Sequence, residues 1–298
     1  MLFNTSNILI DTITNDCLSE KNIHLSVVRL DKIHPVVSGN KLFKLHYFLE
    51  EAIAFCLPGV LSFGGAYSNH LVATAYLCKT SGLKSAGIVR GEKPLNLSPA
   101  LIACMHYGMQ LHFIPRAVYA KKDEVDFIKS LPAKWKQYLV IPEGGYHPKG
   151  AAGAALISSF IEEDSTHICT ALGTATTLAG LLAGAKENQQ VIGIPVLKGM
   201  TDIMARTAYL TDSSHPFQLL DGYHFGGYAK KTPELINFMN LLYQQYKLPT
   251  DFVYTAKMMF AVLDSIEKDF FPRGSKIVCL HTGGLQGNIS LPPGSLIF

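Results

Sequence analysis

Short runs of apolar and β-branched residues alternate with amphipathic segments of helical length along most of this chain. The apolar runs have the length of buried strands, and the segments between them are long enough to return the chain from one parallel strand to the next. The pattern therefore predicts an open α/β architecture on parallel sheets. The predicted strands are Val60–Phe63, Ser85–Val89, Leu111–Ile114, Leu139–Ile141, His167–Leu172, Val191–Pro195 and Lys276–His281. The predicted helices are Lys41–Ala54, Asn69–Thr80, Pro99–Tyr107, Lys149–Ile161, Thr177–Lys186, Pro233–Tyr246 and Ala256–Asp269.

The length of the chain favours two packed lobes, because 298 residues exceed what one hydrophobic core normally holds. No repeat, low-complexity stretch or long linker marks a boundary between them, so the boundary has to come from the order of the elements. We expect residues 42–148 to form a smaller lobe, inserted into a larger one made of residues 1–41 and 149–298.

Composition limits the partners and the compartment. Charged residues make up only 16% of the chain, which favours a surface partly buried in a homo-oligomer, with a dimer as the best expectation. The net charge of +3 is dispersed, so nucleic acid is not an expected partner. The six cysteines are too scattered for a metal or redox pair and predict buried thiols of a reducing compartment. Without a signal-like start or a long apolar segment, we expect a cytoplasmic protein that does not span a membrane.

A lysine-containing helix start is the first candidate site. The segment HPVVSGNKLFKL, residues 34–45, runs from an extended stretch through a glycine turn into a predicted helix that begins at Lys41. A lysine that forms a Schiff base must be partly desolvated so that its amine is often neutral, and a helix N-terminus disfavours the ammonium form while favouring a nearby phosphate. Lys41 suits both conditions. The alternative is that Lys41 and Lys44 are two solvated lysines on an ordinary first turn.

A glycine-rich turn after the strand Val60–Phe63 is the second candidate. The segment GGAYSNH, residues 64–70, ends a predicted strand and begins a helix, which is where α/β sheets bind ligands. Its glycines let the backbone approach a planar ring, Ser68 can bond a carboxylate, and Asn69 can donate to a phenolic oxygen. Alternatively, the segment is a turn with Ser68 as a helix N-cap and a structural His70.

The remaining candidates lie in the second half of the chain. Residues 169–180, CTALGTATTLAG, again give a strand, a small-residue loop and a helix, which suits a monophosphate but lacks the Walker lysine and the dinucleotide spacing. An N-capped core helix remains the alternative there. Tyr228, the segment VYTAK at 253–257 and the segment HTGG at 281–284 offer aromatic faces and hydroxyls. Thr255 has the features of an N-cap. The alternative for Tyr228 and Tyr254 is that they are packing residues at the edge of a lobe.

In this order, the four segments resemble the 1-aminocyclopropane-1-carboxylate (ACC) deaminase and D-cysteine desulfhydrase family of pyridoxal-phosphate (PLP) enzymes. The resemblance spans residues 25–288. It implies PLP fold type II, the tryptophan-synthase-β-like fold, with two open, twisted, mostly parallel-sheet domains and the cofactor between them. It also implies PLP as the cofactor, no metal, and a small amino acid as the substrate.

The resemblance assigns roles to individual residues. Lys41 would form the Schiff base with the cofactor and remove the α-proton of the substrate. Ser68 would contact the substrate carboxylate, and Tyr228 and Tyr254 would flank the ring and the reacting carbons. The other implied cofactor-binding residues are Lys44, Asn69 at the 3-hydroxyl, His70 where ACC deaminases have glutamine, and the phosphate loop of Gly173, Thr174, Ala175, Thr176 and Thr177.

Two positions separate the activities within that family. ACC deaminases have glutamate where this chain has Thr255 and leucine where it has Thr282. A carboxylate keeps the pyridine nitrogen protonated and the ring strongly electron-withdrawing, whereas a hydroxyl only hydrogen-bonds a largely neutral nitrogen. Because β-elimination needs a weaker electron sink than the opening of a cyclopropane, we expect D-cysteine to be converted to pyruvate, ammonia and sulfide. The alternatives are an ACC deaminase, a catalytically idle PLP-binding protein, and a cofactor-free α/β ligand-binding domain.

Overall fold

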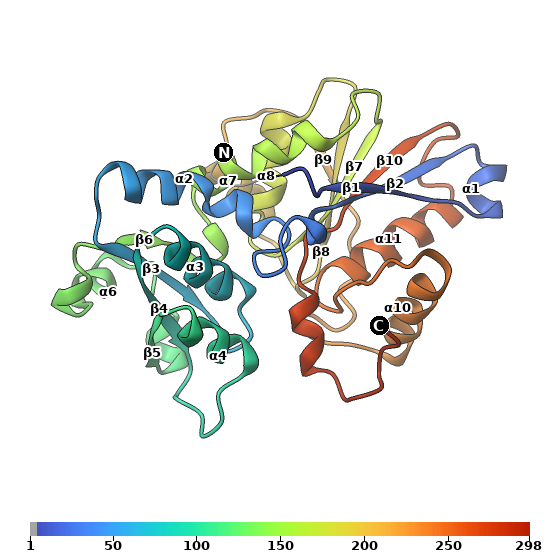
Figure 1. Ribbon diagram of the computed structural model, residues 1–298. Coiled ribbons are helices and arrows are strands. Elements are labelled where there is room, and N and C mark those ends of the chain that lie inside the picture. The colour runs from blue at the N-terminus through green and yellow to red at the C-terminus, as the bar shows by residue number, and fades with distance from the viewer. Residues whose placement is uncertain (1–4) are drawn as a thin grey trace.

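The larger of two sheets is assembled from both ends of the chain. The computed structural model describes residues 5–298 (Figure 1). Six strands form this sheet in the order β1-β2-β10-β7-β8-β9, with β1 antiparallel to β2 and every other pairing parallel. Their bounds are β1 Leu9–Ile13, β2 His24–Arg29, β10 Lys276–Leu280, β7 His167–Leu172, β8 Gln190–Pro195 and β9 Phe217–Leu219. The predicted α/β class with mostly parallel sheets is confirmed.

The central strands of this sheet are buried on both faces. Adjacent residues point to opposite sides, so Ile168 packs into one hydrophobic core and Cys169 into the other. The first core contains α2, α7 and α8, and the second contains α11. Burial on both faces explains why these strands are continuous apolar runs in the sequence. The helices around this sheet are α1 Asp16–Glu20, α7 Pro148–Ala155, α8 Thr176–Gly184, α9 Ile203–Leu210, α10 Pro233–Tyr246 and α11 Thr255–Glu267.

The smaller sheet is continuous in sequence and entirely parallel. Its order is β5-β4-β3-β6, with bounds β5 Gln110–Ile114, β4 Lys84–Arg90, β3 Gly59–Gly64 and β6 Leu139–Ile141. Its helices are α3 Asn69–Thr80, α4 Pro99–His106, α5 Arg116–Tyr119 and α6 Val125–Ser130. All of these elements fall within residues 42–148, while the exact boundary of that lobe stays a prediction.

Helix α2, Lys41–Ala54, packs against α7 through small residues. A Cβ atom at Gly153 of α7 would stand 2.1 Å from the carbonyl oxygen of Phe43, so only glycine allows this approach. Gly180 of α8 meets α7 in the same way, because its Cβ would lie 2.6 Å from the carbonyl oxygen of Ala151. The three helices lie together in Figure 1. This contact fixes the N-terminus of α2, and with it Lys41, at the junction of the two sheets.

Most predicted elements end within a residue or two of the observed ones, but several expectations are wrong. No strand was predicted at β1, β2 or β9, and no helix at the short α1, α5, α6 or α9. The predicted helix Lys149–Ile161 changes after Ala155 into a 3₁₀ helix, Leu156–Phe160. Two of the six thiols are not buried, since Cys17 is half-buried and Cys56 is exposed. Within residues 5–298, no helix combines the length and apolarity needed to cross a membrane.

Candidate active site

Two glycine turns place Lys41 against the end of β10. Gly39 has a φ of +76°, and a Cβ atom there would lie 1.9 Å from the carbonyl oxygen of Thr282, so the two backbones touch only because residue 39 is glycine. Two residues later α2 begins, and the Lys41 Nζ donates to that same Thr282 carbonyl at 3.3 Å. The first and last sequence motifs are therefore joined at the lysine.

The Lys41 amine lies in a desolvated setting. Its Nζ is 5.7 Å from the centre of the Tyr254 ring. Burial lowers the pKa of Lys41 to about 8, although the Asp251 carboxylate acts in the opposite direction. A pKa near 8 leaves a sizeable share of the amine neutral, and hence nucleophilic, close to neutral pH.

Lys44 and His70 extend this environment. Lys44 lies one turn after Lys41 and is buried, and burial together with the Lys41 charge lowers its pKa to about 7. Burial lowers the pKa of His70 to about 3, with further contributions from Lys44 and Lys41. Both His70 ring nitrogens are buried without a hydrogen-bond partner among residues 5–298. The imidazole is therefore neutral and has donor and acceptor capacity to spare.

The threonine loop before α8 lies beside these groups. Ala175 has a left-handed φ of +63°, which turns the chain from β7 into α8. The hydroxyls of Thr174 and Thr176 are 2.9 Å apart, and Thr177 Oγ1 accepts a hydrogen bond from the Asn40 side-chain amide at 2.8 Å. That bond leaves the Asn40 Oδ1 buried without a partner in the described part of the chain. The third motif is thus tied to the residue that precedes Lys41.

A short 3₁₀ turn, Glu143–Gly145, fills the space between Lys44 and the threonine loop. A Cβ atom at Gly144 would lie 2.8 Å from Thr174 Cγ2, and one at Gly145 would lie 3.3 Å from Lys44 Cβ. Both glycines have positive φ. Any residue with a side chain at position 144 or 145 would push Lys44 and Thr174 apart.

These residues fit a phosphorylated aldehyde. Among residues 5–298 no carboxylate forms an ion pair within 4.0 Å of Lys41 or Lys44, so either amine, when protonated, has no carboxylate to neutralise it. Hydroxyls and the N-terminus of α8 adjoin that charge, which is the setting that binds phosphate. Lys41 supplies the partly neutral amine that an aldehyde requires.

The groups predicted to face the substrate come from both sheets. Ser68 Oγ accepts the N–H of Leu71 at 3.2 Å and caps α3, which leaves its own proton free to donate to a carboxylate. Both sequence interpretations of Ser68 are therefore compatible. Asn69 is half-buried at the first position of α3. The Tyr228 and Tyr254 rings meet edge to face at 6.4 Å, and burial raises the pKa of each phenol, so both keep their protons near neutral pH.

Asp251 is a residue that the sequence interpretation missed. Its carboxylate accepts the N–H groups of Val253, Tyr254 and Thr255 at 2.9–3.0 Å and the Thr255 hydroxyl at 2.7 Å. The prediction of Thr255 as an N-cap is therefore wrong, because Asp251 takes the free amides at the start of α11. Thr255 is fully buried, with its hydroxyl proton directed to Asp251. The available signal was an aspartate five residues before a predicted helix.

A second cluster of charge lies directly behind the Thr282 turn. Arg29 donates two bonds to Asp31, at 2.8 and 2.7 Å, and pairs with Asp11 as well. His281 Nδ1 is 3.2 Å from Asp31 Oδ1, and its Nε2 is 2.7 Å from the Pro249 carbonyl oxygen. Burial alone would raise the pKa of Asp31, but Arg29 and His281 hold it below its ordinary value. This network fixes the residue that precedes Thr282.

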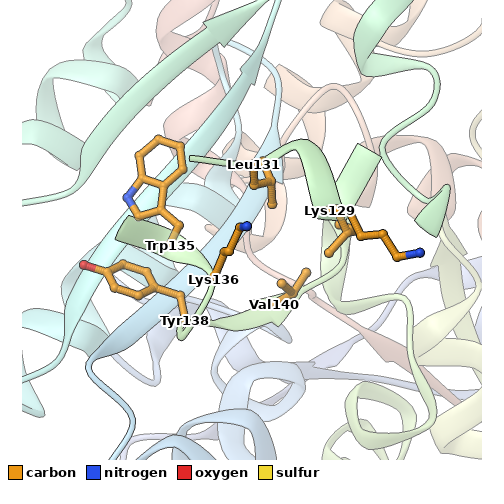
Figure 2. A pocket seen from close by; sticks show the side chains of 7 residues that line it. Lys129, Leu131, Trp135, Lys136, Tyr138 and Val140 are labelled. Atoms are coloured by element: carbon orange, nitrogen blue, oxygen red, sulfur yellow. The ribbon is translucent and has the colours of Figure 1, made fainter. Parts of the chain in front are cut away.

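A surface hollow of the smaller lobe lies apart from these groups. Figure 2 shows that apolar and aromatic side chains and two lysines line it. None of the predicted site residues contributes to this hollow. Its lining residues are Ile128, Lys129, Leu131, Trp135, Lys136, Tyr138 and Val140.

Comparison with known proteins identifies the family. The model of the family "Pyridoxal-phosphate dependent enzyme" matches residues 17–283, and the chain belongs to this family. The bifunctional D-cysteine desulfhydrase/1-aminocyclopropane-1-carboxylate deaminase of Arabidopsis thaliana is 28% identical over 287 residues, which cover 84% of this chain and 70% of that protein. The D-cysteine desulfhydrase of Serratia proteamaculans is 24% identical, with coverage of 89% and 88%.

The crystal structure of an ACC deaminase homologue matches with a TM-score of 0.80 at 25% identity, covering 96% of this chain and 92% of that one. The resemblance seen in the sequence motifs is confirmed, as are fold type II and dependence on PLP. This result removes the alternative of a cofactor-free ligand-binding domain. The relatives carry both activity names, so family membership alone leaves the reaction open.

Proposed function

We propose that this PLP-dependent enzyme catalyses the elimination of sulfide from D-cysteine: D-cysteine and water give pyruvate, ammonia and hydrogen sulfide. Related D-amino acids with a leaving group on the β-carbon, such as β-chloro-D-alanine, would react in the same way. The main support for this proposal is that the Asp251 carboxylate is already engaged. The four hydrogen bonds that it accepts come from residues 253–255, at the start of α11.

We favour elimination from D-cysteine over ACC deamination because of the expected strength of the electron sink. Bound PLP supplies an electron-withdrawing ring that stabilises negative charge at the substrate α-carbon. A free carboxylate at the ring nitrogen would strengthen that effect, but Asp251 already accepts four hydrogen bonds and Thr255 bonds to it. Thr282, next to the Lys41 contact, therefore remains the candidate partner for the ring nitrogen. A hydroxyl there suits the expulsion of a good leaving group better than the opening of a cyclopropane.

The side chains of this chain divide the work as follows. Lys44 and the hydroxyls of Thr174–Thr177 would hold the phosphate of the cofactor. Ser68 would donate its proton to the substrate carboxylate and so orient the α-carbon toward Lys41. The Lys41 Nζ, with a pKa of about 8, would take the α-proton as a general base. The protonated Tyr254 and Tyr228 hydroxyls could then donate to the departing sulfur.

Product assays on the cofactor-loaded enzyme test this proposal. Pyruvate and sulfide should form from D-cysteine much faster than from L-cysteine, and ACC should give little 2-oxobutanoate. The Lys41→Ala variant is the matched control for background chemistry. Turnover of ACC alone would instead establish an ACC deaminase, and a yellow protein that turns over no amino acid would be an idle PLP-binding protein.

We also propose that the enzyme is a cytoplasmic homodimer. The low charged fraction of 16% supports burial of surface between subunits. Ile102 and Met105 support it too, since both are more than half exposed and lie three residues apart on α4. Light scattering coupled to gel filtration should give twice the mass of 32.6 kDa, and a monomer would contradict this part of the proposal.

A further inference from the structure

Lys257 is a buried amine to which neither the sequence motifs nor the proposed chemistry gives a task. It lies on the first turn of α11, two residues after Thr255, and is fully buried. Burial lowers its pKa to about 8, against the effect of Asp251. No carboxylate lies within ion-pair distance of it in residues 5–298. An unpaired buried amine is costly to keep, so its contacts indicate what it is for.

Those contacts all go to one turn of the chain. The Lys257 Nζ donates to the carbonyl oxygens of His224 at 2.8 Å and Gly227 at 2.7 Å. The two carbonyl oxygens belong to residues three positions apart in sequence. Both residues lie 30 or more positions before Lys257. The Lys257 amine therefore donates hydrogen bonds to two carbonyls of a turn that is distant from it in sequence.

This turn, residues 224–230, has an unfavourable backbone conformation. Phe225, Gly226, Gly227 and Ala229 have φ values of +49°, +90°, +115° and +52°. The left-handed region is costly for residues with a Cβ atom, and Phe225 and Ala229 both occupy it. Its own backbone bonds are few: Gly227 N–H donates to His224 at 2.9 Å, and Lys230 N–H donates to Gly227 at 3.2 Å. Bonds from outside the turn are needed to hold such a conformation.

The turn carries Tyr228, whose side chain is half exposed and meets the Tyr254 ring edge to face at 6.4 Å. Tyr254 lies three residues before Lys257, at the start of the same helix. The Lys257 amine thus ties the segment that bears Tyr228 to the segment that bears Tyr254. We propose that Lys257 is a positioning residue that holds the 224–230 turn so that Tyr228 faces the active site. The proposal rests on the function proposed above, because it gives Tyr228 a part in the reaction.

Hydrogen exchange tests the structural half of the proposal without any substrate. Amide exchange is measured in peptides that cover residues 222–231, for the unloaded and the cofactor-loaded protein. Lys257→Met should speed exchange in this turn about tenfold or more, which is the expected effect of losing two charged hydrogen bonds. The matched control is Lys230→Met, which removes an exposed lysine of the same turn and should leave exchange unchanged. Unchanged exchange in Lys257→Met would overturn the proposal.

A double-mutant cycle tests whether Lys257 acts through Tyr228. In D-cysteine turnover, Lys257→Met should lower kcat/KM about tenfold to a hundredfold, and Lys230→Met should not change it. In a Tyr228→Phe background, the Lys257→Met change should lower kcat/KM little further, because both changes act through the Tyr228 hydroxyl. Full additivity of the two losses would overturn the proposal, since Lys257 would then act by another route.

Two further results keep the test decisive. Lys257→Gln retains a side-chain N–H donor and should restore part of both the protection and the activity. If Lys257→Met and Lys257→Gln both failed to fold, Lys257 would support the whole fold rather than one turn, and the proposal would be wrong. If the loaded wild type turned over none of these amino acids, the proposed function would fail, and the exchange experiment alone would decide whether Lys257 holds the turn.

Discussion

Two clusters of buried charge lie on either side of the His281–Thr282 peptide, and they differ in how they are neutralised. Behind it, Arg29 and Asp31 form a two-bond ion pair, and His281 Nδ1 lies 3.2 Å from the Asp31 carboxylate. In front of it, Lys41 and Lys44 have no carboxylate within 4.0 Å in residues 5–298. The paired cluster supports the architecture, whereas the unpaired one is the place where we propose that the anionic cofactor binds.

The pKa values show the same contrast. Burial lowers the pKa of Lys44 to about 7, so its charged form is disfavoured in the unloaded fold. The pKa of Asp31 is held below its ordinary value, so its charged form is favoured. Breaking the paired cluster should therefore cost stability, and removing charge from the unpaired one should cost only cofactor binding.

The largest effect on stability is expected from Asp31→Asn. The change leaves the buried Arg29 guanidinium beside a neutral amide, with the half-buried Asp11 as its remaining carboxylate partner, and should lower the free energy of unfolding by about 3–5 kcal/mol. Denaturant unfolding measures it. The control is Asp123→Asn, which removes a carboxylate of the exposed Lys122–Asp123 pair and should cost less than about 1 kcal/mol. Equal losses in the two variants would remove the distinction between the clusters.

The Asp31 contribution should also depend on pH in one direction. Because its pKa is lower in the folded than in the unfolded chain, the stabilisation is present at neutral pH and fades as the pH falls below about 4. The difference in stability between wild type and Asp31→Asn should shrink in that window.

Lys44→Met should act with the opposite sign on stability. Replacing a buried, unpaired amine by an apolar side chain of similar length should stabilise the unloaded protein by about 1–3 kcal/mol. The affinity for PLP should fall about tenfold to a hundredfold through the loss of a charged contact to phosphate. Thermal unfolding of the unloaded protein and PLP titration measure the two effects. A variant that lost stability and kept its affinity would show Lys44 to be structural.

The smallest expected effect is the pH dependence of cofactor uptake. Lys41 attacks an aldehyde only as the neutral amine, so the rate of condensation with PLP should rise with pH and level off above about 8. An ordinary lysine would give a rate still rising at pH 9, because its pKa is about 10.4. Stopped-flow absorbance at a series of pH values distinguishes the two profiles.

The elements that could be predicted from the sequence are those whose bounds depend on a few neighbouring residues. The bounds of α2, α3, β6 and β7 agree with the predicted ones because caps, glycines and apolar periodicity act over a few residues. The glycine at position 39 was recognised as a turn, and the structure shows its close contact with Thr282.

What could not be predicted depends on contacts between distant segments. Arg29 and Asp31 are two residues apart, but His281 lies 250 positions beyond Asp31, and only the pairing of β2 with β10 brings it to them. Lys257 stood inside a recognised motif, but its partners are carbonyl oxygens of a turn that no local pattern specifies. Asp251 was missed because its role in capping α11 was assigned to Thr255.

Borohydride reduction tests whether the Lys41 amine condenses with PLP. The hydride converts the imine between lysine and cofactor to a stable amine, and mass spectrometry of the peptides then locates the phosphopyridoxyl group. We expect the label on Lys41 in the wild type and no label in Lys41→Ala. A label on Lys44 or Lys257, or an unlabelled wild-type protein that still turns over D-cysteine, would show that Lys41 does not form the Schiff base.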